Sequence, residues 1–454
     1  MKFLIIGAGS VGTSLAERLT STENEVVLID QSQKAIKEIS TKLDIQIVKG
    51  NGCDPKILIS AGIENADYFI AVTDDDETNM AACLVSKALN EKAKRIARIR
   101  KISFDYDEVD TTEIENIFDL IINPDLAAAD YLTKLLKVPG AYDVIEFAQG
   151  RLKAVALEIS EKSEVANKKI SSLKEEVQDI PLLLNAIVRD NVLIVPRGSD
   201  RIRVGDLIYC LTYPKHINRL LEIAGQKPHI LNNIMICGDT GFARALAHNL
   251  ENNNLNVKLI VPKVRSNEII EEFEETLLVE GDITNQNLLL EENIHEADAF
   301  LALGEEEEEN ILAALLSKKL GADFCVALIN KSSYLPIVNS IGVDTVVNSY
   351  LAASLAIFKF IYAGSIISAS SLVHTEASYI EIIADAKISF IDKKIKDINI
   401  PYGILITAII RDEEVIIPTG EDIIRMGDRI VIFYISSAVS KLEKILNIKL
   451  QLFI

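Results

Sequence analysis

The chain has 454 residues and a net charge of −20, from 67 acidic and 47 basic side chains. A surface this acidic repels nucleic-acid backbones and anionic lipid, so we expect no nucleic-acid partner; it suits a protein that handles cations or meets a basic partner, or one merely kept soluble in the cytosol. Five scattered cysteines without a CxxC pair, and five histidines without metal-ligand spacing, favour a reducing compartment and argue against a structural zinc site.

The first part of the chain alternates short β-rich runs with amphipathic helices. The runs are KFLIIGAG, EVVLID, IQIVKG, YFIAVT and RIARIR. This alternation predicts an α/β fold with a doubly wound parallel sheet, and the nearly wholly apolar strands fit a sheet covered on both faces. No charged-then-apolar leader precedes the first run at Lys2, so a secretory signal is not expected.

A GxGxxG motif comes after the first predicted strand and begins the first predicted helix. Gly7 permits a tight turn, Gly9 lets a pyrophosphate approach the backbone, and Gly12 lets helix and strand pack closely. The free N–H groups of the helix then hold the phosphates. Asp30, at the end of EVVLID, is placed to accept from ribose hydroxyls and to repel a 2′-phosphate. The pattern predicts NAD(H) rather than NADP(H), but does not separate NAD(H) from ATP or ADP.

Other residues join this crevice if ligands sit at the carboxyl ends of the strands. Asn51 and Gly52 come after the third strand, and Thr73-Asp74 comes after the fourth. Arg98 and Arg100 share one face of the fifth strand, where they offer positive charge to phosphates or lie solvated at the surface. On a sheet with both faces covered, these two side chains need an anionic partner.

The next part of the chain, roughly 143–225, has more strands and a short helix, which predicts a small α+β domain. The proline in the stretch 226–229 interrupts any helix and marks the joint between two halves. Residues 351–373 form an apolar segment with a single charge, Lys359, and are long enough to span a membrane. The corresponding segment 126–145 carries Asp130, Lys134 and Lys137 and cannot span, so we expect 351–373 to be a buried helix that runs into a small-residue linker.

The sequence repeats itself with a period of about half its length. Residues 66–89 return as 297–320 with 11 of 24 positions identical, and 186–206 return as 408–428 with 12 of 21 identical. A period this long indicates two whole modules in tandem rather than a solenoid. The second half therefore has the same plan, at 231–348 and 368–450.

The second copy has lost the nucleotide fingerprint. Its three glycine positions read Gly238, Thr240 and Ala243, and Val261 stands in the place of Asp30. We expect this site to be empty or to bind a different ligand more weakly. The acidic run Glu305–Glu309 suggests a solvated loop and helix start, with a cation site as the less favoured alternative.

The glycine loop, VVLID, the block AGIENADYFIAVTDDDETN and the duplicated AIVRD tail resemble RCK domains, which regulate potassium conductance. The tandem arrangement resembles the regulatory subunits of Trk-type potassium uptake systems over essentially the whole chain. The resemblance implies an RCK N-terminal and a small α+β RCK C-terminal domain in each half. Their expected bounds are 1–122, 143–226, 231–348 and 368–451.

The resemblance also implies a role and a set of binding residues. The role is that of a cytoplasmic subunit, not an enzyme, that lies on the inner face of the membrane through a TrkH-like potassium channel or transporter. Four chains would form a homotetrameric ring, and NAD(H), or ATP and ADP, would change its shape and gate the partner. The ribose would be held by Asp30, and the pyrophosphate by Gly7, Ala8, Gly9, Ser10, Val11 and Gly12. The rest of the nucleotide crevice would be lined by Asn51, Gly52, Thr73, Asp74 and Arg98. The family usually has aspartate at Asn51, as the second copy does at Asp282.

Two other interpretations of the sequence stay open. An NAD-dependent dehydrogenase would need a general acid or base beside the nicotinamide, and none of the five histidines lies in a recognisable catalytic setting. A regulator of another cation transporter, such as a cation/proton antiporter, would share the same domains.

Overall fold

A computed structural model describes the chain except for residues 21–23, 101–115, 174–176, 178–179, 191, 228–230, 263–271, 332–333, 335–337, 339–340, 362–365, 373–374, 376, 386–387, 413 and 447–454. The described residues fall into two compact units. One combines Met1–Thr133 with Asn232–Phe360, and the other combines Lys134–Leu231 with Ile361–Ile454. Each unit therefore takes one part from each half of the repeated sequence.

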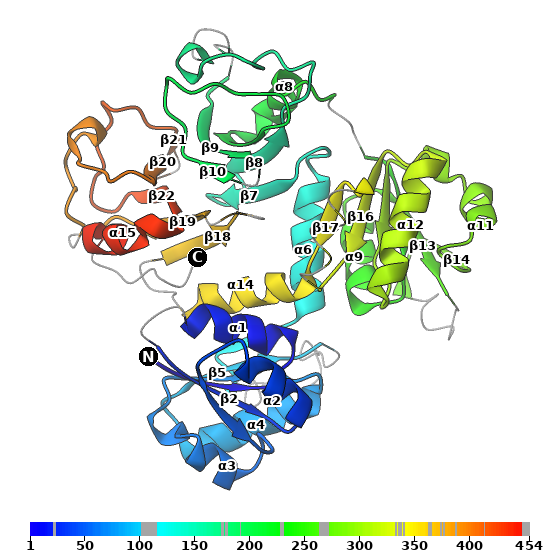
Figure 1. Cartoon of the computed structure of the whole chain (residues 1–454), viewed down its shortest axis with the longest axis vertical. Coiled ribbons are helices and arrows are strands. Elements are labelled where there is room, and N and C mark those ends of the chain that lie inside the picture. The colour runs from blue at the N-terminus through cyan, green and yellow to red at the C-terminus, as the bar shows by residue number, and fades with distance from the viewer. Residues whose placement is uncertain are drawn as a thin grey trace. The chain divides into compact units, whose positions relative to one another are not determined.

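The first module of the first unit is a parallel sheet with helices on both sides (Figure 1). Its strand order is β3-β2-β1-β4-β5-β6, which places the change of direction between β1 and β4. The elements are β1 Lys2–Ile6, α1 Ser10–Thr20, β2 Glu25–Asp30, α2 Gln33–Ser40, β3 Gln46–Lys49, α3 Pro55–Ser60, β4 Tyr68–Ala71, α4 Asp76–Leu89, β5 Lys94–Arg98, β6 Leu120–Ile122 and α6 Pro124–Leu136. Ligands of such sheets bind at the carboxyl ends of the strands beside this change of direction.

The central strands are apolar because both faces of the sheet are covered. Phe3, Leu4 and Ile5 of β1 are fully buried, as are Phe69 and Ile70 of β4. The expectation of a doubly wound parallel sheet is thus confirmed. The five runs seen in the sequence are joined by a sixth strand, β6, whose three residues pair with the end of β5. A run this short gives no periodic signal, and β6 depends on the neighbouring strand for its formation.

The second module of this unit repeats the first. Its sheet is parallel, in the order β14-β13-β12-β15-β16-β17. The elements are β12 Asn233–Cys237, α9 Gly241–Glu251, β13 Asn256–Val261, β14 Leu277–Glu280, α11 Gln286–Glu291, β15 Ala299–Ala302, α12 Glu307–Leu320, β16 Phe324–Leu328, β17 Thr345–Val347 and α14 Ser349–Ile361. Glu305 and Glu306 precede α12 and the next three acids form its first turn, as the acidic run predicts.

The second unit contains two antiparallel sheets of five strands. Their orders are β10-β9-β11-β8-β7 and β18-β19-β22-β20-β21. The elements are β7 Asp143–Phe147, β8 Leu152–Glu158, β9 Leu183–Arg189, β10 Val192–Ile194, β11 Leu207–Thr212, α8 Ile217–Ile223, β18 Ile366–Ser371, β19 Ala377–Ile383, β20 Ile404–Arg411, β21 Glu414–Ile416, β22 Arg429–Ile435 and α15 Val439–Leu446. The predicted small α+β domains are confirmed. The linker expected after α14 is wrong in part, because residues 366–371 pair with β19 as strand β18.

The apolar segment beginning at Leu351 supplies most of α14, which starts at Ser349 and is 13 residues long. Within the described residues, no helix combines the length and the apolar character that a membrane crossing requires. Ser354 of α14 approaches Ser14 of α1, and the guanidinium of Arg18 lies over the ring of Phe358. The segment thus contributes a helix that packs on the helix after the glycine loop.

Candidate functional site

The glycine loop between β1 and α1 has the geometry that its sequence predicts. Gly7 has φ +104°, and a Cβ there would lie 2.9 Å from the backbone nitrogen of Thr73. A Cβ on Gly12 would lie 1.9 Å from the carbonyl oxygen of Gly7. A Cβ on Gly9 would meet nothing within 4 Å. Two glycines are therefore required for packing, and the middle one opens onto space that a ligand can occupy.

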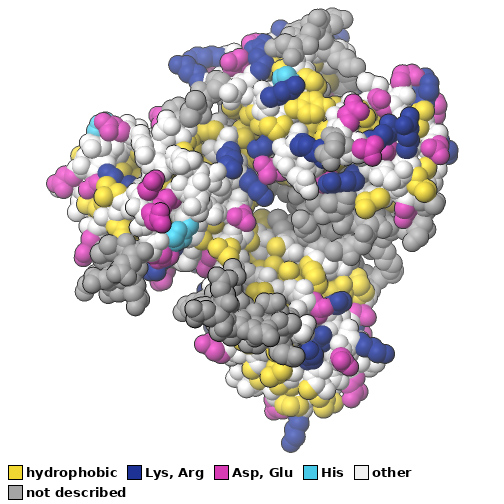
Figure 2. Space-filling model, turned by 180° about the vertical axis from the view of Figure 1, so that it is seen from behind, with side chains coloured by type: hydrophobic (Ala, Val, Ile, Leu, Met, Phe, Trp, Pro, Cys, Tyr) yellow, Lys and Arg dark blue, Asp and Glu magenta, His cyan; other side chains and the backbone are white. Residues whose placement is uncertain are grey.

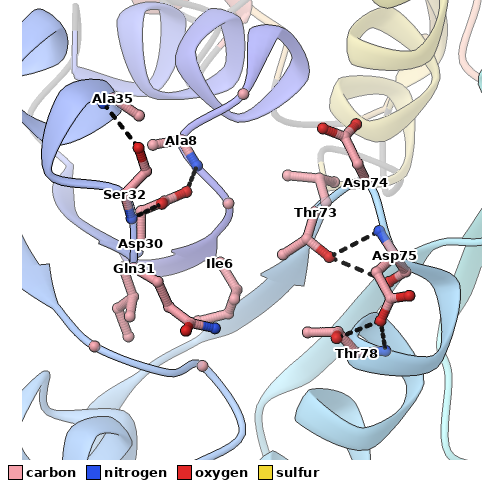
Figure 3. Close-up of a pocket in the computed structure, with 16 residues that line it drawn as sticks. Ile6, Ala8, Asp30, Gln31, Ser32, Ala35, Thr73, Asp74, Asp75 and Thr78 are labelled. Atoms are coloured by element: carbon pink, nitrogen blue, oxygen red, sulfur yellow. Dashed lines mark hydrogen bonds between the residues drawn. The ribbon is translucent and has the colours of Figure 1, made fainter.

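Asp30 closes the other side of this loop. Its two carboxylate oxygens accept from the backbone N–H groups of Ala8 and Ser32, each at 2.6 Å (Figure 3). The carboxylate therefore joins the end of β2 to the first turn of the glycine loop. It lines a cavity of about 400 Å³, large enough for much of a nucleotide. The residues lining it are Ile6, Gly7, Ala8, Gly9, Ile29, Asp30, Gln31, Ser32, Ala35, Gly50, Gly52, Val72, Thr73, Asp74, Asp75 and Thr78.

The opposite wall lies after β4 and begins α4. Asp75 caps this helix, since its carboxylate accepts from the backbone N–H of Thr78 at 2.8 Å and from its hydroxyl (Figure 3). These hydrogen bonds lower the pKa of Asp75, so it is charged throughout the neutral range. The hydroxyl of Thr73 donates to the carbonyl of Asp75 and to Asn79. The wall is thus a fixed hydrogen-bonded turn.

An ion pair stands beside this wall. The guanidinium of Arg98 donates to the Asp74 carboxylate at 2.9 Å and to the Thr73 carbonyl at 3.4 Å. The side chain of Arg98 is 6% exposed and that of Asp74 is 88% exposed. Arg100 donates to the backbone carbonyl of Asp74. Asp74 is therefore the anionic partner that we expected Arg98 to need.

The structure brings most of the predicted binding residues to one cavity. Gly7, Ala8, Gly9, Asp30, Gly52, Thr73 and Asp74 line it. Ser10 is exposed at the start of α1, while Val11 and Gly12 are buried behind the loop. Asn51 accepts from the backbone N–H of Cys53 in a turn, and neither Asn51 nor Arg98 is among the lining residues. Arg98 lies behind Asp74 instead.

Sequence reasoning missed several residues of the walls. Gln31, Ser32, Asp75 and Thr78 also line the cavity, and the spacing of a capping Asp75 and its Thr78 is a signal that was available. Asn79 was missed as well. It is fully buried and bonds both Thr73 and the carbonyl of Arg98. The signal was its recurrence as Asn310 within the repeated block.

The second module fills the corresponding loop with its own side chains. Gly238 keeps the turn, with φ +130°. The hydroxyl of Thr240 caps α9 by accepting from Ala243 N–H, and it donates to the Leu303 carbonyl. Asp239 accepts from the guanidinium of Arg244 at 2.7 Å. A carboxylate and a hydroxyl therefore stand where the first module presents Ala8 and the open Gly9.

Comparison with known proteins agrees with this tandem architecture. The TrkA-N domain matches residues 3–124 and 234–349, and the TrkA-C domain matches residues 154–225 and 379–447. A "Trk system potassium uptake protein TrkA" of Haemophilus influenzae is 33% identical over 438 residues, 95% of each chain. A "Trk system potassium uptake protein TrkA homolog 1" of Methanosarcina mazei is 34% identical, over 98% of this chain and 99% of its own.

Solved structures show the same fold. The GsuK RCK domain matches with a TM-score of 0.60 at 17% identity, covering 98% of this chain and 95% of its own. The GsuK channel bound to NAD matches with a TM-score of 0.59, covering 98% of this chain and 79% of its own. The fold and the loop define a tandem RCK protein with a Rossmann-type nucleotide crevice in its first module. The chain belongs to the TrkA family of potassium uptake proteins.

Proposed function

We propose that this chain is the nucleotide-binding regulatory subunit of a Trk-type potassium uptake system. The observation that carries the proposal is the cavity of the first module, in which Asp30, an open Gly9 and the start of α1 face one space. A dinucleotide would place its pyrophosphate at the N–H groups of α1 and a ribose at Asp30. Relatives matched over almost their whole length are named for potassium uptake, which supports the transport role.

The ligand we propose is NAD(H), with ATP or ADP as competitors at the same loop. Asp30 would accept from a free ribose hydroxyl and oppose a 2′-phosphate. The second module would bind no dinucleotide, because Thr240 and Asp239 already occupy the places of Gly9 and Ala8. One working site per chain is the consequence of this asymmetry.

The charged groups of the cavity fit a regulatory role in which no reaction is catalysed. Its described lining residues include three carboxylates, and each is engaged: Asp30 with the loop, Asp75 with α4, and Asp74 with Arg98. Neither histidine, cysteine nor lysine is among these lining residues to act as a general acid or base. We therefore infer a protein that binds a nucleotide without turning it over.

The regulated partner would be a separate membrane subunit that conducts potassium, with this chain on its cytoplasmic face. A ligand shifts a conformational equilibrium only by its difference in affinity for the two states, typically about 1–3 kcal/mol per site. A ring of several chains would sum such increments into a bias on the gate. A regulator of a different cation transporter would use the same device.

Isothermal titration of the full chain with NADH, NAD⁺, ATP and ADP tests the proposal by counting sites. We expect one site per chain, with binding lost or at least tenfold weaker in Asp30→Ala. The matched variant Val261→Ala changes the equivalent position of the second module and should leave binding unaltered. Equal losses from both changes, or oxidation of NADH by the parent chain in the presence of small substrates, would overturn the proposal.

A further inference from the structure

The ion pair beside the cavity holds a buried cation that a ligand could use. Arg98 is anchored from behind, because Asn79 donates to its carbonyl at 2.8 Å. Its guanidinium points to Asp74, and its Nε is buried without a hydrogen-bond partner. The Asp74 carboxylate is largely in water, where a single ion pair contributes little. A ligand can therefore displace the Asp74 carboxylate, whereas the Arg98 cation stays in place.

The surroundings of this pair are already rich in negative charge. Asp76 accepts from the backbone N–H of Arg100 at 2.8 Å and is 6% exposed. Asp125, at the start of α6, also faces the two arginines; burial raises its pKa, and Arg100 and Arg98 oppose that rise. The described charged groups here are thus two arginines and three carboxylates. The charges of these described residues leave no net positive charge beside the crevice.

The side chains that line the cavity also carry negative charge. Among the described residues that line the cavity, the charged ones are Asp30, Asp74 and Asp75, and none is a lysine or an arginine. In Figure 3, Asp30 turns toward the glycine loop on one wall, and Asp74 and Asp75 lie on the other. A pyrophosphate can use the N–H groups of α1. Negative charge placed beyond the pyrophosphate, toward β4, meets carboxylates instead.

We propose that Asp74 is a specificity residue that selects the group attached beyond the pyrophosphate. While it occupies Arg98, the site favours a dinucleotide whose second half carries no extra negative charge, and it disfavours a nucleoside triphosphate. A terminal phosphate reaches Arg98 only by displacing the Asp74 carboxylate. This inference rests on the proposed nucleotide site and adds the selectivity of that site.

The internal repeat supplies a matched control. Glu305 occupies the position of Asp74 in the second module, where Gly304 replaces Thr73 and Leu328 ends the strand equivalent to β5. Glu305→Gln removes one negative charge of the same kind from the same place in the fold. It leaves the first cavity unchanged.

The experiment is isothermal titration of the full chain with NAD⁺ and with ATP in magnesium-free buffer, which keeps the full charge of ATP. In Asp74→Asn we expect ATP affinity to rise roughly two- to fivefold, the size of effect that an exposed charge pair has, and NAD⁺ affinity to change less than twofold. Glu305→Gln should alter neither. The double change Asp74→Asn with Arg98→Gln should remove the gain, because it removes the cation that the phosphate would reach.

Equal changes for both ligands in Asp74→Asn, no change for either, or the same gain in Glu305→Gln would each overturn the selectivity. So would a gain that survives in the double variant, since Arg98 would then have no part in it. The proposed function fails in a different way. If the parent chain binds none of these nucleotides, the site itself is absent and the selectivity falls with it.

Discussion

Asn79 is a buried polar side chain that fixes both the wall of the cavity and the cation behind it. Its Oδ1 accepts from the backbone N–H of Thr73 at 2.9 Å and from the Thr73 hydroxyl at 2.7 Å. Its Nδ2 donates to the carbonyls of Thr73 and Arg98. Asn310 has the same role in the second module. Its Oδ1 accepts from the backbone N–H of Gly304, and its Nδ2 donates to the carbonyls of Gly304 and Leu328. One amide in each module thus ties the ends of two neighbouring strands together.

Asn79→Ala should reduce both stability and nucleotide affinity. It leaves buried backbone groups without partners, which costs about 1–3 kcal/mol each, so the free energy of unfolding should fall by roughly 2 kcal/mol or more. Affinity should fall because Thr73 and Arg98 lose their fixed positions. Asn310→Ala should cost similar stability and leave affinity unchanged. Denaturant unfolding and titration of both variants decide the matter, and equal loss of affinity in the two would contradict the assignment.

Among the elements, α1 is held against the sheet by the absence of a side chain at Gly12 rather than by contacts of that residue. Gly12 lies against the carbonyl of Gly7, with no room for a methyl group. Gly9 immediately precedes the helix and faces open space. The loop and the first turn of α1 therefore contain a glycine needed for packing and a glycine needed only for the ligand.

Replacing each glycine by alanine should separate these two roles. Gly12→Ala must push α1 from the sheet or strain the loop, and overpacking of this kind typically costs about 1–3 kcal/mol. It should lower both stability and nucleotide affinity. Gly9→Ala should keep stability within about 0.5–1 kcal/mol of the parent and still weaken binding, because the methyl group takes space beside the pyrophosphate. Thermal unfolding with titration tests this, and a Gly9→Ala variant that binds normally would sink it.

The elements also show what the sequence can and cannot predict. The parallel sheet is predictable from apolar runs that alternate with helices, and the loop from three glycines and Asp30. Strand β6 could not be predicted, since its three residues form a strand only beside β5. Strand β18 could not be predicted either, because its small residues fit a linker equally well and form a strand only by pairing with β19. The pair of Arg98 with Asp74 joins residues 24 positions apart, so it depends on the fold and not on local pattern.

At the scale of the whole molecule, the duplication places the same helices on the surface of both modules. Ile59 of α3 is 48% exposed, and Leu290, its equivalent in α11, is 43% exposed. The next long helix of each module also exposes a leucine, at positions that do not correspond in the repeat: Leu84 of α4 is 55% exposed and Leu312 of α12 is 60% exposed. Apolar side chains also lie among charged ones on the face shown in Figure 2. Large exposed apolar side chains on the corresponding helices of two modules fit surfaces that pack against other modules.

We therefore expect the chain to assemble with copies of itself, with a closed tetramer as the proposed state. Light scattering at micromolar concentration should give a mass several times the 50.1 kDa of one chain. Leu84→Glu and Leu312→Glu together should lower that mass, because a charge at the centre of an apolar contact is desolvated without a partner. Met426→Glu changes a 70% exposed side chain of the other unit and should leave the mass unaltered. A parent chain that is monomeric with and without nucleotide would contradict the ring, and gating would then have to act through single chains, without the summed bias of several sites.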